Sequence, residues 1–569
     1  MNWKSIVFTV LLLLAGVAVL VVVALRGPAP PAHRVYVNGS VLVMDEAGTV
    51  AQALSTRGER IDEVGSTEKI MASVNQDTEV VDLHGRTLLP GFIDAHGHFP
   101  GSGLRVMSTD LNSPPIGDKQ AMADVFAAIS ERAAVTDRGE WVTGFGYDDT
   151  LLAEKRHPTR AELDAISTDH PIALLHVSGH MLVANSAALE IVGIDASTPD
   201  PQGGVIGRRN GSREPNGLLE ENARMTLLDQ MQSTSVFDAY RLFKFAADEY
   251  SSMGVTTAQS GGVGPALVSG LYWFSRLGVV PQRLVLFPWE RDYGEDLLNG
   301  DYDPADYTTD RVYMGPVKLV ADGSIQGYTG YLSEPYFKPY HGDEDYRGYP
   351  SIAREELFEQ VAGLHKAGYQ LAIHGNGDAS IEDILDAFEA AQASYPREDP
   401  RMILIHGQMA REDQVARMAS LGVTPSFFTA HTWYWGDRHR DIFMGPQRAQ
   451  NISPSRWAQQ YGVRFSSHLD TPVTPMQPLQ AVWSMVYRQT VGGDVLGPDQ
   501  RIGIMDALRA VTIDAAWQVF QDENRGSLEP GKLADLVVLS GDLLRDPLAM
   551  RALQVDMTVI GGAIIYERR

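Results

Sequence analysis

LLPGFIDAHGH, residues 88–98, is the stretch that decides the fold, because an apolar segment here ends in two histidines one residue apart. The apolar part is typical of a buried strand, and side chains at positions i and i+2 of a strand point to the same face. His96 and His98 can therefore present two imidazoles to one metal ion from a rigid element. The alternative is a loop in which the two histidines share no ligand.

The composition limits the class of protein. The chain has 569 residues, of which 44% are hydrophobic, so it can bury a core of barrel size together with additional parts. Its formal net charge of −25 and its lack of basic runs argue against a nucleic-acid partner. The absence of cysteine excludes disulfides, thiolate zinc ligands and a thiol nucleophile.

Residues 6–25 form an uncharged apolar run between Lys4 and Arg26. A helix of this length spans about 30 Å, the hydrocarbon thickness of a bilayer. Because the run is longer than the apolar part of a cleaved signal peptide and no cleavage site is clear, we expect an uncleaved membrane anchor and spacer in residues 1–33. The membrane is then a partner of the protein, and the catalytic domain is expected to be periplasmic or otherwise extracytoplasmic.

Short strands with turns are predicted at both ends of the chain, in residues 34–87 and 525–569. Two small β-rich ends are most simply explained as one composite β-sandwich. The dipeptide Asn38-Gly39 predicts a hairpin turn within the first of them.

The segment between these ends, residues 88–524, alternates apolar strands with amphipathic helices, which predicts an α/β protein with a (β/α)8 TIM barrel. The eight strands are predicted at residues 92–98, 254–262, 283–289, 316–324, 369–378, 402–408, 423–431 and 463–473. The long gap after the first strand predicts an inserted subdomain at about residues 105–250. This insertion would cover the carboxyl ends of the strands, where barrel enzymes hold their active sites.

Polar residues recur on these otherwise apolar strands, and burying them is costly unless they are paired. They are His96 and His98 on the first strand, Lys318 on the fourth, His374 on the fifth, His406 on the sixth and Asp470 on the eighth. Together they predict a site for two divalent metal ions. Each histidine could instead be a structural core residue, and Lys318 could simply pair with Asp322.

Four motifs resemble the amidohydrolase superfamily, and specifically the amidohydrolase 3 branch typified by N-substituted formamide deformylase. The motifs are PGFIDAHGH (90–98), VKLVADGS (317–324), LAIHGNGD (371–378) and EPGKLADLVVL (529–539). The resemblance covers about residues 34–569 and implies a barrel with two metal ions, for which we expect zinc. It implies that His96, His98 and Asp470 bind one ion and that His374 and His406 bind the other.

The same resemblance implies that Lys318 bridges the two ions as an N-carboxylysine, since a carbamate offers two anionic oxygens and an ammonium offers none. It also makes Asp470 catalytic, as the group that takes a proton from water and passes it to the leaving nitrogen. The structural alternative for Asp470 is a capping carboxylate before Thr471-Pro472. The chain departs from the family pattern at Gln259 and at Ile405. These departures leave open whether the site binds one metal ion or two.

The insertion and the loops supply further candidate residues. Ser178-Gly179-His180 resembles a family motif that places His180 over the substrate carbonyl as a catalytic residue. A separate metal pair of His176 and His180 would need a helix, which the Ser-Gly pair disfavours. Glu221, His431 and Trp433 are predicted to bind substrate, although ordinary loop packing also explains the last two. The tyrosine-rich loop 327–350 is a candidate lid.

These features predict a metal-dependent hydrolase that cleaves a non-peptide carbon–nitrogen bond, such as an amide or formamide, in a small molecule. An esterase or lactonase would use the same site. A membrane-anchored binding protein without turnover is the alternative from a different class, and a homo-oligomer is compatible with either. Specificity in such barrels resides in loops and inserts, so the motifs do not identify the substrate.

Overall fold

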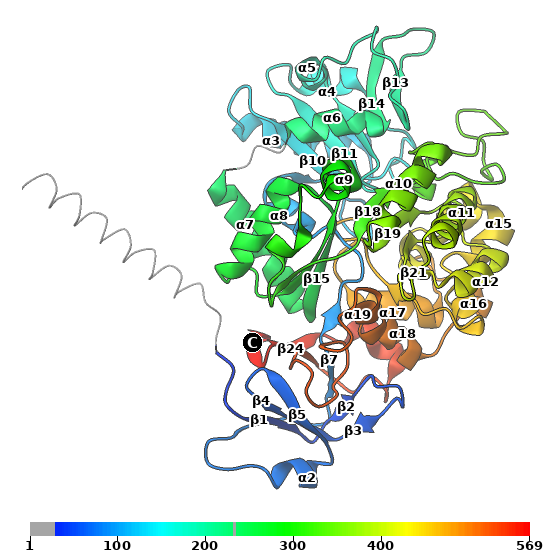
Figure 1. Ribbon diagram of the computed structural model, residues 1–569. Helices are drawn as coiled ribbons and strands as arrows, with labels where there is room; N and C mark the ends of the chain where they lie inside the picture. The colour runs from blue at the N-terminus through cyan, green and yellow to red at the C-terminus, as the bar shows by residue number, and fades with distance from the viewer. Residues whose placement is uncertain (1–28, 232–234) are drawn as a thin grey trace, which may run out of the picture.

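The structure, a computed structural model, describes residues 29–231 and 235–569 (Figure 1). The predicted membrane anchor, residues 6–25, lies outside the described residues. Within the described ranges no helix is both long enough and apolar enough to cross a membrane.

The α/β part of the molecule contains parallel strands in two sheets, and their order in space follows the order in the chain. The first sheet contains β8 (Phe92–Ile93), β15 (Val255–Val263), β16 (Arg283–Pro288) and β17 (Val312–Met314). The second contains β18 (Val317–Val320), β19 (Leu371–Gly375), β20 (Ile403–His406), β21 (Thr424–Phe427) and β22 (Ser466–Ser467). Each of the eight predicted strand ranges contains at least part of an observed strand.

The fourth predicted strand, residues 316–324, contains β18, and β17 lies directly before it across Gly315-Pro316, where proline has no N–H to donate to a ladder. The two sheets nevertheless meet on both sides. A parallel bridge joins Trp289 to Lys318, and the Asp470 N–H donates to the His96 carbonyl over 3.2 Å. The structure therefore shows two parallel sheets in contact, and their closure into one barrel remains a prediction.

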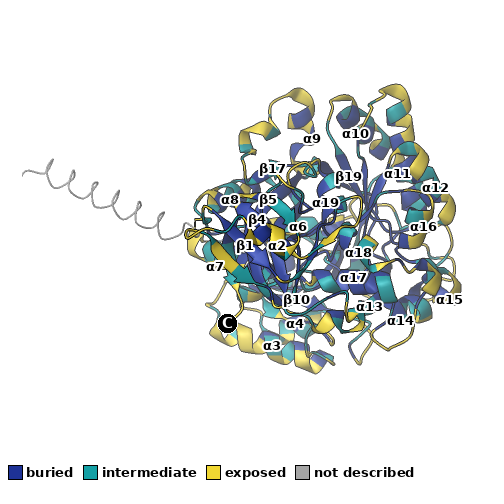
Figure 2. Ribbon diagram, turned by 90° about the horizontal axis from the view of Figure 1, so that it is seen from below, coloured by how far each residue is buried: buried dark blue, intermediate teal, exposed yellow. Residues whose placement is uncertain are grey.

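Helices between the strands cover the outside of the sheets, including α8 (Pro265–Arg276), α10 (Arg354–Lys366), α11 (Asp378–Ser394) and α12 (Glu412–Leu421). On α11 the buried residues include Ile381, Ile384, Leu385 and Phe388, a spacing that forms one apolar face of a helix. Figure 2 shows the opposite faces of the outer helices exposed to solvent. The strands are therefore buried on both faces, which explains their continuous apolar sequences.

The long segment after β8 forms a six-stranded sheet of its own with the order β13-β14-β12-β11-β10-β9. Its strands are β9 (Thr109–Asp110), β10 (Val142–Tyr147), β11 (Ile172–His176), β12 (Met181–Ala184), β13 (Gly204–Arg208) and β14 (Pro215–Glu221). Helices α3 (Met122–Val135), α4 (Arg160–Ile166), α5 (Ser186–Ile191) and α6 (Asn222–Gln230) pack with it. In Figure 1 this subdomain lies at the end of the molecule opposite to both terminal sheets.

The two chain ends build two further sheets around a shared apolar cluster that includes Tyr36, Leu88 and Leu536. Their strands are β1 (Arg34–Val37), β2 (Ser40–Leu42), β3 (Val50–Ala51), β4 (Ala53–Arg57), β5 (Arg60–Gly65), β6 (Glu79–Asp82), β7 (Thr87–Pro90), β23 (Leu536–Leu539), β24 (Val555–Ile560) and β25 (Ala563–Glu567). The predicted hairpin at Asn38-Gly39 is wrong. β1 pairs with β4 and β6, whereas β2 pairs with β3 and β7, so the chain passes there from one sheet to the other.

A buried ion pair connects the terminal sheets to the α/β part. The Arg283 guanidinium at the start of β16 donates to both carboxylate oxygens of Asp535, over 2.7 and 3.2 Å. Both side chains are only 4% exposed. Because both side chains are buried, removing one of them would leave the other charge with neither water nor a counter-charge to stabilise it.

We expect Asp535→Ala to lower the free energy of unfolding by about 3–5 kcal/mol, because it leaves the Arg283 charge buried and unpaired. Chemical denaturation followed by circular dichroism measures this loss. The matched control is Asp169→Ala, which removes a carboxylate from an exposed pair with Arg138 and should cost less than about 1 kcal/mol. Equal losses in the two variants would contradict a structural role for the buried pair.

Candidate metal centre

Three predicted ligands converge where the first and last strands of the α/β part end. The Asp470 Oδ1 atom lies 3.7 Å from His96 Nε2 and 3.2 Å from His98 Nε2. This oxygen is buried and has no hydrogen-bond partner among the described residues. Buried polar atoms are normally satisfied, so an unsatisfied carboxylate oxygen that faces two imidazole nitrogens fits a bound divalent cation.

The other ring nitrogens of both histidines are held by β15. His96 Nδ1 lies 3.2 Å from Gln259 Oε1, and His98 Nδ1 lies 2.8 Å from the Gly261 carbonyl oxygen. When Nδ1 donates to these oxygens, the Nε2 lone pair is directed toward Asp470, as in histidines that bind metals. Glycine is required at position 261, because a Cβ there would lie 2.3 Å from His96 Cε1.

The electrostatics of the three ligands favour a cation. Burial lowers the pKa of His96 well below its ordinary value, so its imidazole is neutral at pH 7 and can act as a ligand. Burial raises the pKa of Asp470, but the neighbouring His98 and His96 imidazoles lower it by a larger amount. The net shift of the Asp470 pKa is therefore downward. The His96 imidazole is therefore a neutral nitrogen donor beside an ionised carboxylate.

Lys318 lies beside this group on β18. Its Nζ is 3.3 Å from His96 Nε2, and burial lowers its pKa to about 7. The alternative pairing with Asp322 is not formed among the described residues. The Asp322 carboxylate instead accepts hydrogen bonds from the backbone N–H groups of the segments after β18 and β19, at Tyr331, Asn376 and Gly377.

The second predicted ligand pair is close together but less convergent. The rings of His374 and His406 are 4.4 Å apart between centroids. His374 Nε2 lies 3.3 Å from the Gly323 carbonyl oxygen and 3.1 Å from the Asn376 side-chain nitrogen. Among the described residues, no group of three His, Cys, Asp or Glu ligands includes this pair. The first set is therefore the better defined cation site.

Two residues of this centre were missed by the sequence analysis. His468, which was not among the predicted site residues, is buried with its Nε2 3.0 Å from His406 Nδ1. Its position two residues before Asp470 repeats the spacing of His96 and His98, which could have revealed it. Asp94 is also buried, accepts from the Tyr250 hydroxyl over 3.0 Å, and has a pKa raised by burial to about 7.

Several residues here adopt the left-handed backbone conformation that favours glycine. His406 has φ 71°, Asp470 has φ 54°, and Glu221 has φ 47° with ψ −122°. Such conformations are costly for residues with a Cβ and persist only where the surroundings enforce them. Their location supports assignment of this region as the functional site.

His180 and Glu221 form a pair that reaches the metal centre from the inserted subdomain. His180 Nδ1 lies 2.8 Å from Glu221 Oε2, and the rings of His180 and His374 are 5.0 Å apart between centroids. The Glu221 side chain is only 3% exposed and its backbone N–H donates to the His180 carbonyl. The structure thus places Glu221 as the partner that orients His180. A glycine at position 323 leaves room for the Glu221 carboxylate, because a Cβ there would lie 2.1 Å from Glu221 Oε1.

The two predicted substrate residues after β21 have different surroundings. His431, in α13 (His431–Tyr434), packs on Phe428 with ring centroids 4.0 Å apart, and its buried Nδ1 has no partner among the described residues. Trp433 instead has the Arg551 guanidinium over its ring at 3.7 Å. The tryptophan that contacts His431 is Trp435, at 5.5 Å between centroids.

The candidate lid loop, residues 327–350, contacts the inserted subdomain directly. The hydroxyls of Tyr340 and Tyr349 donate to the two carboxylate oxygens of Glu220 over 3.3 and 3.1 Å. Glu220 is the neighbour of Glu221 on β14. The loop and the His180–Glu221 pair are therefore held by adjacent residues of one strand.

We expect Gln259→Leu to weaken binding of a divalent metal about 10–100-fold, because the His96 ring loses the acceptor that orients it. Isothermal titration of the metal-free protein with zinc measures the change. Gln202→Leu, at an exposed position of the insertion, is the matched control and should leave the affinity unchanged. An unaltered affinity in Gln259→Leu would contradict this role.

Comparison with known proteins agrees with this geometry. Residues 79–566 match the amidohydrolase family. The chain is 31% identical over 549 residues to N-substituted formamide deformylase of Arthrobacter pascens, covering 94% of this chain and 98% of that protein. It is 29% identical over 563 residues to LONG AFTER FAR-RED 3 of Arabidopsis thaliana, covering 95% and 94%. An uncharacterised metal-dependent hydrolase of Pyrococcus horikoshii has the same fold, with a TM-score of 0.70, 24% identity and coverage of 94% and 100%.

Proposed function

The chain belongs to the amidohydrolase family, and we propose that it hydrolyses a carbon–nitrogen bond other than a peptide bond in a small molecule. The observation that carries this proposal is the unsatisfied Asp470 Oδ1 between the imidazoles of His96 and His98. The similarity to the N-substituted formamide deformylase of Arthrobacter pascens supports an amide or formamide as the substrate class.

His96, His98 and Asp470 would hold one metal ion, and His374 and His406 would contribute to a second, with Lys318 between them. A bound divalent ion, for which we expect zinc, supplies Lewis-acid activation of water and of the scissile carbonyl. The neutral state of His96 and the ionised state of Asp470 are the protonation states that such binding requires.

Lys318 is suited to become an N-carboxylysine because its lowered pKa leaves a large fraction of neutral amine at pH 7. The neutral Nζ attacks carbon dioxide, a nitrogen–carbon bond forms and one proton leaves the nitrogen. The product is an anionic carbamate with two oxygen donors, which an ammonium lacks.

Asp470, which follows β22, and His180, which lies between β11 and β12 of the inserted subdomain, would assist the hydrolysis with their side chains. Asp470 accepts a proton from the attacking water and transfers it to the nitrogen that leaves. His180, oriented by Glu221, would stabilise the substrate carbonyl oxygen as negative charge develops there, by donating from Nε2 in its doubly protonated form while Nδ1–H donates to Glu221. The contact of His180 with Glu221 favours a fixed orientation of this imidazole during the reaction.

We also propose that the two parallel sheets are parts of one (β/α)8 barrel and that residues 6–25 anchor it to a membrane, with the catalytic part outside the cytoplasm. The bridge from Trp289 to Lys318 and the hydrogen bond from Asp470 to His96 support the barrel. The uncharged run of apolar residues supports the anchor.

The proposed activity is tested by assaying the full-length protein, supplied with zinc and bicarbonate, against formamides, N-acyl amines, N-acyl amino acids and esters. We expect turnover of an amide-type substrate and its loss in His98→Ala. Turnover of esters alone would replace the amidase assignment with an esterase. A protein that binds no divalent metal under these conditions would contradict the enzyme assignment and leave a binding protein.

We expect Lys318→Ala to lower kcat by about 100-fold or more, because the two metal ions lose their shared anionic ligand. Short carboxylic acids such as formate or acetate should restore part of the activity by occupying the vacated space. The control is Lys366→Ala, at an exposed position near the end of α10. Full activity and full metal content in Lys318→Ala would show that the lysine is not a ligand.

A further inference from the structure

Two adjacent carboxylates, Asp148 and Asp149, follow β10 of the inserted subdomain and form with His176 a second cluster of potential ligand atoms. None of these residues belongs to the metal centre described above. Each carboxylate contacts a different segment of the candidate site.

Asp149 contacts the segment that carries His180. Its Oδ1 lies 3.2 Å from His176 Nε2, and His176 Nδ1 lies 2.8 Å from Ser178 Oγ. The same Ser178 hydroxyl oxygen accepts from the His180 backbone N–H over 3.2 Å. A continuous series of hydrogen bonds therefore runs from Asp149 to the backbone of His180.

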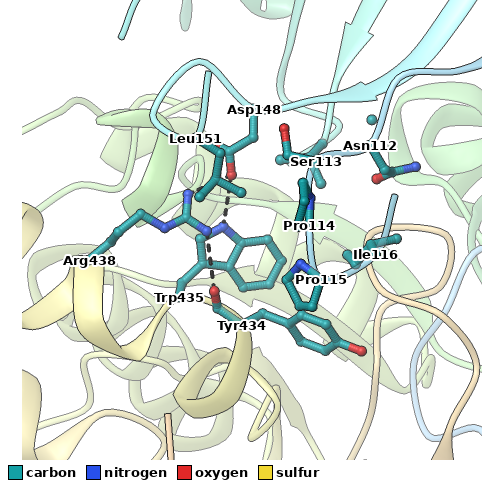
Figure 3. Close-up of a pocket in the computed structure, with 12 residues that line it drawn as sticks. Asn112, Ser113, Pro114, Pro115, Ile116, Asp148, Leu151, Tyr434, Trp435 and Arg438 are labelled. Carbon is teal, nitrogen blue, oxygen red and sulfur yellow. Dashed lines mark hydrogen bonds and ion pairs between the residues drawn. The ribbon is translucent and has the colours of Figure 1, made fainter. Parts of the chain in front are cut away.

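Asp148 contacts the segment that carries His431. Its Oδ2 accepts from Arg438 Nη1 over 2.6 Å and from Trp435 Nε1 over 3.3 Å (Figure 3). Trp435 in turn packs against the His431 ring, and the Trp435 backbone N–H donates to the His431 carbonyl over 2.9 Å. Arg438 also donates to the Tyr434 carbonyl over 3.2 Å.

The cluster differs from the metal centre in that its side chains are satisfied by the protein. Asp148 Oδ1 accepts from both the backbone N–H and the hydroxyl of Thr150, and its Oδ2 accepts from Arg438 and Trp435. Within the described ranges, no polar side-chain atom of Asp148, Asp149 or His176 is buried without a partner. These contacts favour a structural connection over a cation site.

Burial makes these contacts strong. The side chains of Asp148 and Arg438 are only 5% and 13% exposed. Burial raises the pKa of Asp148, but the Arg438 guanidinium and the His176 imidazole lower it by a larger amount. The carboxylate therefore stays ionised. Removing one member of a buried ion pair leaves the other charge uncompensated.

We propose that Asp148 and Asp149 are positioning residues that hold two walls of the substrate site, and this inference rests on the proposed function. Asp149 acts through His176 and Ser178 on His180, which contacts the reacting carbonyl. Asp148 acts through Trp435 and Arg438 on His431, which contacts the substrate away from the bond that breaks. One turn of the insertion thereby sets the relative position of a catalytic group and a binding group.

The two neighbours should have different kinetic effects. We expect Asp149→Asn to lower kcat about tenfold with KM within about twofold, because an interaction of the transition state is misplaced. Asp148→Asn should raise KM about tenfold with kcat within about twofold, because uniform substrate binding is lost. The matched control, Asp169→Asn, lies in the same subdomain at an exposed ion pair and should change neither constant.

Hydrogen exchange of the full-length protein tests the same inference without a substrate, so its outcome is separate from that of the proposed function. Asp148→Asn should speed amide exchange in residues 431–438 and Asp149→Asn in residues 176–180. Arg438→Met should reproduce Asp148→Asn, and the double variant should exchange no faster than either single one. Faster exchange throughout β10 and β11 in both aspartate variants would overturn the inference. The inference would also be overturned if the Asp149→Asn variant lost a bound metal ion that the His98→Ala variant retained.

Discussion

The candidate site depends on one buried, ionised carboxylate, that of Asp470. Asp470 is buried, its Oδ1 accepts no hydrogen bond from the described residues, and its backbone is in a left-handed conformation. Burying an unpaired charge is costly, and the neutral imidazole of His96 offsets this cost only in part. A cation bound between these three side chains removes the imbalance, which is why their arrangement is explained better by ligation than by packing.

The α/β sheets and the inserted subdomain supply different parts of this chemistry. The predicted metal ligands stand on or directly after strands of the two parallel sheets, which fixes their positions closely. The groups that we propose to face the substrate, His180 and His431, stand on shorter segments that contact Ser178 and Trp435, respectively. This division allows the substrate contacts to vary among proteins with the same metal centre.

Much of the fold and the convergence of His96, His98 and Asp470 could be predicted from the sequence, because buried strands have continuous apolar stretches and a polar residue within one is conspicuous. The partners of those ligands could not be predicted in this way. Gln259 and Asp94 are ordinary residues in sequence, and only the pairing of β15 with β8 brings Gln259 to His96. The contact of His431 with Trp435 rather than Trp433 follows from the direction of one short helix. The Asn38-Gly39 hairpin failed because a turn dipeptide does not determine which sheet each flanking strand joins.

The two clusters of aspartate and histidine show that residue type and proximity do not by themselves define a metal site. Both bring three potential ligand atoms close together, yet the oxygens of Asp148 are occupied by Arg438, Trp435 and Thr150. Asp470 Oδ1 has no such donor. A carboxylate whose lone pairs already accept from fixed donors gains little from a cation, whereas one that lacks donors gains the full interaction. The distribution of hydrogen-bond donors around the carboxylates therefore separates the centre that can bind metal from the one that holds the insertion in place.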